Sequence, residues 1–435
     1  MSATVRPLWG RLTLQHWSLL ALLLGATMGL AGHHYAWAWL PRASALLSPL
    51  GVLWVNALQM AVLPLLITQL LSTLVRVDAE PSIGRLGRGA VMLFVVYLTV
   101  GGLLSVIVTT QLVTWLPPGG ELLAGWRVQA VAPGAQAALA ATPVTFADWF
   151  QSLVPRNPFE AAARGSVLQL LVFTVLFGVA AARLPQDARE SLARPIQALA
   201  TAMMTLVHWI LLATPVGVFV LMLGVMLQAG TGALQVLGVY IVGLSVLMLM
   251  CTVLLYPVTA LVARVSMRRF ARGVAPAQLV AAGTQSSLAS LPALVHGAND
   301  HLALPASSAG FSLTLAVSTF KLNQPIYLIF QLLLLSHVFA VPLGVEQVGM
   351  YLLATVVFSF SVAGIPGGGG APSTLPLLVA FGLPIEGVVL FEAANTIPDI
   401  FMTMLNVTAD MSVATILARR ARRASPVSDT FANPV

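Results

Sequence analysis

Residues 281–292 read Ala-Ala-Gly-Thr-Gln-Ser-Ser-Leu-Ala-Ser-Leu-Pro, and residues 363–373 read Ala-Gly-Ile-Pro-Gly-Gly-Gly-Gly-Ala-Pro-Ser. Both segments lie in apolar surroundings, yet they hold too much serine, glycine and proline for the interior of a lipid-facing helix. Irregular backbone at membrane depth is tolerated only where it is buried in protein or lines a cavity. Two interrupted segments at corresponding places in two halves of a chain are typical of an inverted-repeat transporter with a site near the bilayer midplane.

The composition excludes a soluble protein. The 435 residues are 58% hydrophobic and 8% charged, whereas soluble domains carry roughly a quarter charged residues. Apolar stretches long enough to cross about 30 Å of hydrocarbon recur along the chain, which predicts an all-α membrane protein. The arginines behind the net charge of +7 form short clusters that flank apolar segments, so we expect no nucleic-acid partner.

The apolar runs predict regular spans, followed by a less regular region. The regular spans lie near residues 13–32, 46–75, 89–115, 165–182, 197–227 and 233–263, and the later segments near 276–298, 308–340, 345–380 and 385–417. The arginine clusters fall on one side of these spans, which places both termini in the cytoplasm. Because both termini lie on the same side, the number of complete crossings must be even. About eight transmembrane helices satisfy this condition if 276–298 and 345–380 are re-entrant helical hairpins.

Lys321 is the only lysine in the chain, and it lies inside the apolar run from Phe311 to Leu335. Intramembrane ionisable residues usually face a cavity and pair with an opposite charge. The alternatives are a side chain that snorkels to the interface or a purely structural ion pair. The distance of Lys321 from either end of the run disfavours snorkelling.

The last span carries a polar face. Asp399, Thr403, Asn406 and Asp410 follow one another at steps of four, three and four residues, which places them on one side of a helix. They predict one wall of a polar cavity. The alternative is a polar stripe that only joins helices, and the two carboxylates favour the cavity.

The sequence supports neither a metal site nor a hydrolase active site. The seven histidines are scattered without metal-ligand spacing, so we expect no metal site. Ser286 and Ser287 have no adjacent histidine or aspartate, which disfavours an intramembrane hydrolase. We therefore expect a transport protein that is not an enzyme.

Several motifs together resemble the dicarboxylate/amino acid:cation symporter family, which includes the glutamate transporter homologues. The motifs are Met-Ala-Val-Leu-Pro at 60–64, Gly-Arg-Leu-Gly at 84–87, Val-Pro-Arg-Asn-Pro-Phe at 154–159, Pro-Val-Gly-Val-Phe at 215–219, the serine-rich hairpin ending at Leu291-Pro292, the glycine-rich tip from Ala363, and Asn-Val-Thr-Ala-Asp at 406–410. The resemblance spans nearly the whole chain.

The resemblance implies a homotrimer in the inner (plasma) membrane that works as an elevator. The static scaffold would comprise residues 1–75 (first and second helices) and 116–227 (an extracytoplasmic loop with the fourth and fifth helices). The moving transport domain would comprise residues 76–115 (third helix) and 228–423 (sixth helix, first hairpin, seventh helix, second hairpin and eighth helix), followed by a cytoplasmic tail at 424–435.

The resemblance also assigns site residues. Ser286 and Ser287 would hold the substrate carboxylate together with Asn406, Asp399 would pair with its ammonium group, and Thr403 would contact its side chain. The tip from Pro366 to Gly370, including Gly369, would close as the extracellular gate.

Departures from the family pattern bear on specificity and coupling. Met402 and Gln285 stand where acidic-substrate members place arginines. A side-chain carboxylate would lack a bidentate partner, so we expect a small neutral amino acid as substrate. The cation motif is replaced by residues 321–325, Lys-Leu-Asn-Gln-Pro, so that Lys321, Asn323 and Asp410 form the expected coupling site.

The hypothesis is that the Lys321 ammonium stands in for a sodium ion and pairs with Asp410. Transport would then be proton-coupled or sodium-independent, with no cofactor apart from sodium or protons as coupling ion. Two alternatives stay open: a sodium-coupled symporter of dicarboxylates or acidic amino acids, and a non-transporting sensor or anion channel on the same fold.

Overall fold

The computed structural model describes residues 14–75, 81–117, 151, 154–163, 167–361, 378, 387–388, 391 and 394–424. All regular secondary structure within these ranges is helical. The all-α prediction is therefore confirmed for the described part of the chain.

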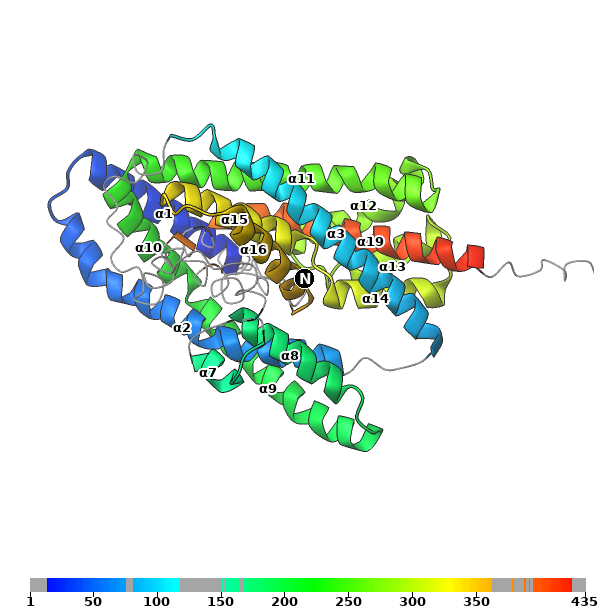
Figure 1. The fold of residues 1–435 in the computed structure, drawn as a ribbon. Helices are drawn as coiled ribbons and strands as arrows, with labels where there is room; N and C mark the ends of the chain where they lie inside the picture. Colours follow the sequence, from blue (N-terminus) through cyan, green and yellow to red (C-terminus); the bar gives the residue numbers. More distant parts are fainter. Residues whose placement is uncertain are drawn as a thin grey trace, which may run out of the picture.

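Most of the long helices run roughly along the length of the molecule (Figure 1). In chain order they are α1 (Leu14–His34), α2 (Leu40–Val75), α3 (Pro81–Val113), α7 (Pro158–Ala163), α8 (Val167–Ala181), α9 (Gln186–Leu212), α10 (Thr214–Ala229), α11 (Thr231–Ala263), α12 (Met267–Thr284), α13 (Leu291–Asp300), α14 (Ala306–Thr319), α15 (Asn323–Val338), α16 (Val345–Phe358), the 3₁₀ turn η2 (Ser359–Ser361) and α19 (Thr396–Ala424).

The helices pack in two main sets. In one set, α1 packs on α10, and α2 packs on α8, α9 and α10. In the other, α19 is central and contacts α11, α12 and α14, while α15 packs on α3. The predicted division into a static scaffold and a moving transport domain stays a prediction.

The serine-rich interruption forms a turn between two packed helices. Gln285 ends α12 with a left-handed backbone, at φ +51°, and residues 285–290 are not helical before α13 begins. A Cβ atom added at Gly297 would lie 1.9 Å from the carbonyl oxygen of Gly273. The backbones of α12 and α13 therefore approach so closely that only glycine fits at position 297.

Two long predicted segments are broken in the structure. The run at 308–340 ends one helix at Thr319 and starts the next at Asn323, because Phe320 is extended (φ −115°, ψ 123°) and its ring stacks on Phe94 with centroids 4.3 Å apart. The segment predicted at 197–227 begins earlier, at Gln186, and is bent by 53° between α9 and α10. Pro215 lies in the first turn of α10, where its missing N–H is tolerated.

Among the described residues, length and apolar composition qualify three helices as membrane spans: Gly89–Val113, Thr231–Ala263 and Thr396–Arg420. A fourth span results if the bent pair α9 and α10 crosses as one unit. The multi-pass character of the chain is supported, and the count of about eight crossings stays a prediction.

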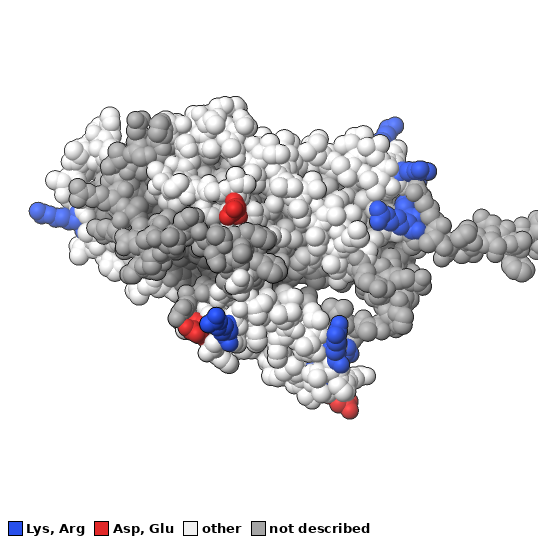
Figure 2. All heavy atoms as spheres, in the orientation of Figure 1, with Lys and Arg blue, Asp and Glu red and all other residues white. Residues whose placement is uncertain are grey.

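Basic side chains gather at the end of the molecule where α12 begins and α19 ends (Figure 2). Arg264, Arg268 and Arg272 lie there with exposed side chains. The positive-inside rule predicts that this end faces the cytoplasm.

Candidate substrate and coupling-ion site

The turn of the first hairpin lies on the first turn of α19. The Gln285 side-chain amide donates a hydrogen bond of 2.8 Å to the carbonyl oxygen of Thr396. Ser286 and Ser287 follow Gln285 and are buried. The Ser286 hydroxyl accepts a hydrogen bond of 3.2 Å from the Ala289 amide. The fold thus brings the predicted carboxylate-binding serines to the end of α19 that carries Asp399.

The predicted polar face of α19 is present as one face of a continuous helix. Asp399 is half-buried, whereas Thr403, Asn406 and Asp410 are buried. Thr403 donates to the carbonyl oxygen of Asp399 at 2.9 Å. The Asn406 side-chain oxygen accepts the backbone N–H of Asn323 at 3.0 Å, which joins α19 to the start of α15. The predicted contact of the Asn406 side chain with a substrate stays a prediction.

Of the other predicted site residues, one is buried on α19 and two lie outside the described part of the chain. Met402 is buried beside the polar face, with 3% of its surface exposed. Pro366 and Gly369 lie outside the described residues. The contribution of the second hairpin to the site therefore stays a prediction.

Lys321 lies in the break between α14 and α15 and is 3% exposed. Its ammonium group donates to the carbonyl oxygens of Val317, at 2.5 Å, and Phe320, at 3.2 Å. These carbonyls belong to the last turn of α14 and the residue that ends it. The carboxyl end of a helix carries partial negative charge and unpaired carbonyls, so this helix end stabilises the buried cation.

Asp410 is fully buried, and neither of its carboxylate oxygens has a hydrogen-bond partner among the described residues. No hydrogen bond joins this carboxylate to Lys321, and the two buried groups interact electrostatically at longer range. The side-chain oxygen of Asn323 is also buried without a partner in the described part of the chain. The region around Lys321 therefore combines helix carbonyls, an amide oxygen and a carboxylate, and these are the oxygen types that bind hard cations.

The sequence interpretation missed a polar cluster that supports the first turn of α19. The Tyr240 hydroxyl donates to the Asn395 side-chain oxygen at 3.0 Å, and Gln331 donates to the Tyr327 hydroxyl at 2.8 Å. The Tyr240 ring stacks on Phe391 with centroids 4.3 Å apart. Polar residues within apolar runs were the available signal, but their partners lie far away in the sequence.

A second chain of hydroxyl groups was also missed. Ser412 lies two residues after Asp410, and its hydroxyl bonds to the Tyr97 hydroxyl at 2.9 Å and to the Thr259 hydroxyl at 2.5 Å. This chain ties α3 and α11 to the part of α19 that holds Asp410.

Sequence comparisons connect this architecture to known transporters. The model of the sodium:dicarboxylate symporter family matches residues 14–420. The proton/glutamate-aspartate symporter of Escherichia coli K12 is 26% identical over 415 residues, which cover 93% of this chain and 92% of that protein. The proton/sodium-glutamate symport protein of Bacillus subtilis 168 is 23% identical over 400 residues, covering 92% and 90%. The C4-dicarboxylate transport protein 1 of Pseudomonas aeruginosa PAO1 is 24% identical over 392 residues, covering 87% and 84%. The chain therefore belongs to the sodium:dicarboxylate symporter family and is a membrane transporter, not an enzyme.

Proposed function

We propose that this transporter carries a small neutral amino acid by an elevator mechanism, as a homotrimer in the inner membrane. In this proposal its cation coupling is altered because Lys321 stands in for a cation, so that transport is proton-coupled or sodium-independent. The buried Lys321 ammonium, held by two helix carbonyls with Asp410 as counter-charge, carries the proposal.

The substrate class rests on two positions that the family resemblance assigns to the binding region. Met402 is buried on the helix that carries Asp399 and offers no positive charge. Gln285 is engaged with the Thr396 carbonyl, so its amide supports α19. A second carboxylate in the substrate would be buried without a charged partner at these positions, which is strongly unfavourable. A neutral side chain avoids this penalty.

The coupling proposal rests on the surroundings of Lys321. A sodium ion would need several oxygen ligands and would compete with an ammonium group that already contacts the same kind of oxygens. Because Lys321 is covalently attached, its amine stays at this position throughout the transport cycle and can change charge only by releasing or taking up a proton. We therefore expect substrate binding that does not require sodium.

The substrate is tested by counterflow into proteoliposomes. Alanine, serine and leucine are offered as competitors in parallel with aspartate and succinate. The proposal expects competition by the neutral amino acids, and competition by aspartate or succinate alone would contradict it. The variant Asp399→Asn is expected to abolish counterflow, since the substrate ammonium loses its carboxylate partner.

The coupling ion is tested with the same vesicles under sodium, potassium and pH gradients. Wild-type uptake is expected to be unaffected by sodium. Lys321→Met removes the attached cation, and its uptake is expected to depend on sodium. Sodium-dependent uptake by the wild type that is unaltered in Lys321→Met would refute the role of Lys321 as a cation.

The second candidate is a sodium-coupled symporter of dicarboxylates or acidic amino acids. The names of the three relatives favour it, because each names glutamate, aspartate or C4-dicarboxylates as the cargo of that protein. The competition assay separates the two candidates directly.

A further inference from the structure

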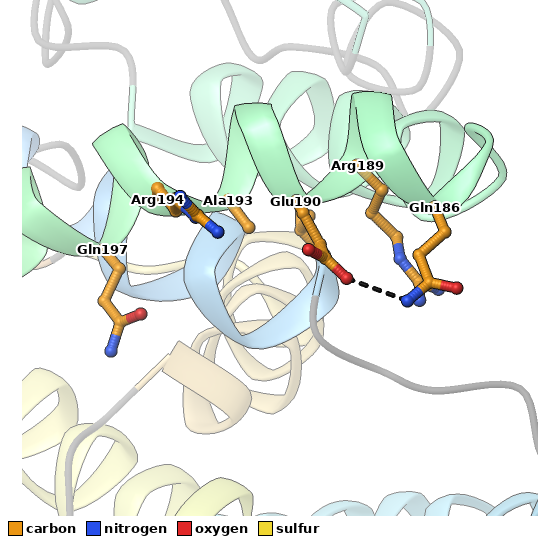
Figure 3. A pocket seen from close by; sticks show the side chains of 7 residues that line it. Gln186, Arg189, Glu190, Ala193, Arg194 and Gln197 are labelled. Carbon is orange, nitrogen blue, oxygen red and sulfur yellow. Dashed lines mark hydrogen bonds between the residues drawn. The ribbon is translucent and has the colours of Figure 1, made fainter.

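A polar cavity of about 580 Å³ lies between the carboxyl end of α2 and the first half of α9. The described residues on its wall are Val75 and one face of α9 from Gln186 to Gln197 (Figure 3). Small-molecule sites are clefts of roughly 300–1,000 Å³, so the cavity has room for a ligand. It lies on the set of helices that does not include Asp399 or Lys321 and is therefore separate from the transport site.

The charges that line this cavity favour an anion. Arg189 and Arg194 are one to two helical turns apart on the wall, and Glu190 is the acidic residue among the described residues that line it. The Glu190 carboxylate accepts a hydrogen bond of 2.9 Å from the Gln186 side chain (Figure 3). Among the described lining residues, two guanidinium groups accompany one carboxylate. Guanidinium groups bind phosphate through paired N–H donors.

The position of the cavity favours a membrane-associated source. Gln186 opens α9 directly after the apolar helix α8, at an arginine-bearing end that the positive-inside rule predicts to be cytoplasmic. Basic pockets between membrane helices on this side bind anionic lipid headgroups. We propose that the cavity between α2 and α9 binds a phosphate-bearing anion, supplied by an anionic phospholipid or by free phosphate, through Arg189 and Arg194.

The test measures thermal unfolding of the purified full-length protein in a neutral detergent. The probes are dihexanoyl-phosphatidylglycerol, dihexanoyl-phosphatidylcholine and inorganic phosphate. The variant R189Q/R194Q removes both guanidinium groups from the cavity. The matched control R268Q/R272Q removes two exposed arginines from α12, which lies away from the cavity.

We expect phosphatidylglycerol to raise the unfolding temperature of the wild type and of the control. In R189Q/R194Q the lipid concentration that gives half of this effect should be roughly tenfold higher, because charge-assisted hydrogen bonds to the phosphate are lost. Protection by phosphatidylglycerol and not by phosphate assigns the site to a lipid, and equal protection by inorganic phosphate assigns it to the free ion. Both outcomes support an anion site.

The variant Glu190→Gln keeps the acceptor for Gln186 but removes the negative charge, so it is expected to bind phosphatidylglycerol more tightly. This opposite effect keeps the proposal testable if R189Q/R194Q does not fold. The proposal would be overturned if phosphatidylglycerol stabilised Glu190→Gln and R189Q/R194Q as it stabilises the wild type. It would also be overturned if R268Q/R272Q lost as much of the stabilisation as R189Q/R194Q, or if no probe raised the unfolding temperature.

Discussion

Replacing Asp410 with asparagine removes the counter-charge of a cation that the structure buries almost completely. Lys321 is 3% exposed and Asp410 is 0% exposed, so water cannot take over the role of the lost carboxylate without a local rearrangement. Removal of one partner from a buried charge pair costs about 3–5 kcal/mol. The lower end, about 3 kcal/mol, is expected for Asp410→Asn, because the ammonium keeps its two carbonyl acceptors.

The double variant Lys321→Met/Asp410→Asn removes both charges together. Replacement of a complete buried pair by uncharged residues is often close to neutral. We therefore expect the double variant to be more stable than Asp410→Asn alone. In a double-mutant cycle of the wild type, the two single variants and the double variant, the coupling energy is expected to be about 2 kcal/mol, within the range for residues that share a network.

Cys251 provides the assay, because it is the only cysteine and is buried in α11. When opening and closing are fast relative to labelling, the rate at which a thiol reagent labels it follows the population of the open form. A decrease of about 3 kcal/mol in the free energy of unfolding then corresponds to roughly 100-fold faster labelling, because each 1.4 kcal/mol is about tenfold. Rates in the double variant equal to the product of the two single effects would show that the charges are independent and would refute this account of the site.

Three further predictions address specificity, packing and positioning. Met402→Arg should allow aspartate to compete in counterflow and weaken competition by alanine, and an unchanged substrate range would contradict the assignment of Met402 to the binding region. Gly297→Ala should destabilise the hairpin by about 1–3 kcal/mol through overpacking, whereas Gly310→Ala, with open space around its Cβ position, should be nearly neutral; comparable unfolding temperatures for the two variants would disprove the close approach. Tyr240→Phe should lower the free energy of unfolding by about 1 kcal/mol and slow transport, because the Tyr240 hydroxyl holds Asn395 one turn before Asp399. Transport kinetics identical to the wild type would count against a positioning role.

The features that were predictable from sequence are those with a local signal. Serine, glycine and proline at 281–292 lower helix propensity at that position, and the structure breaks the helix there. The polar face of α19 follows from the spacing of its residues, because the helical period applies wherever a helix is continuous. Neither inference requires knowledge of a distant contact.

The break at Phe320–Leu322 had only a weak local signal. Mostly apolar residues lie on both sides of the break within the run from Phe311 to Leu335, so hydrophobic periodicity alone does not distinguish one helix from two. Lys321 and Pro325 marked the position, but their charge and backbone chemistry suit either a kink or a full interruption. Similarly, the contact of Gln285 with Thr396 joins residues 111 positions apart, and no local pattern in the sequence specifies it.

The break and the lysine have one physical explanation. A helix that ends inside a membrane protein leaves carbonyl oxygens that cannot be hydrated, and each unsatisfied group is costly there. The end of α14 directs two such carbonyls at the Lys321 ammonium, near a carboxylate that has no hydrogen-bond partner among the described residues. This arrangement of oxygens is favourable only when a positive charge occupies it. A dissociable ion could satisfy that requirement for part of a transport cycle, whereas the side chain of Lys321 cannot leave and can exchange only a proton. This difference is the reason to expect altered cation coupling in this chain.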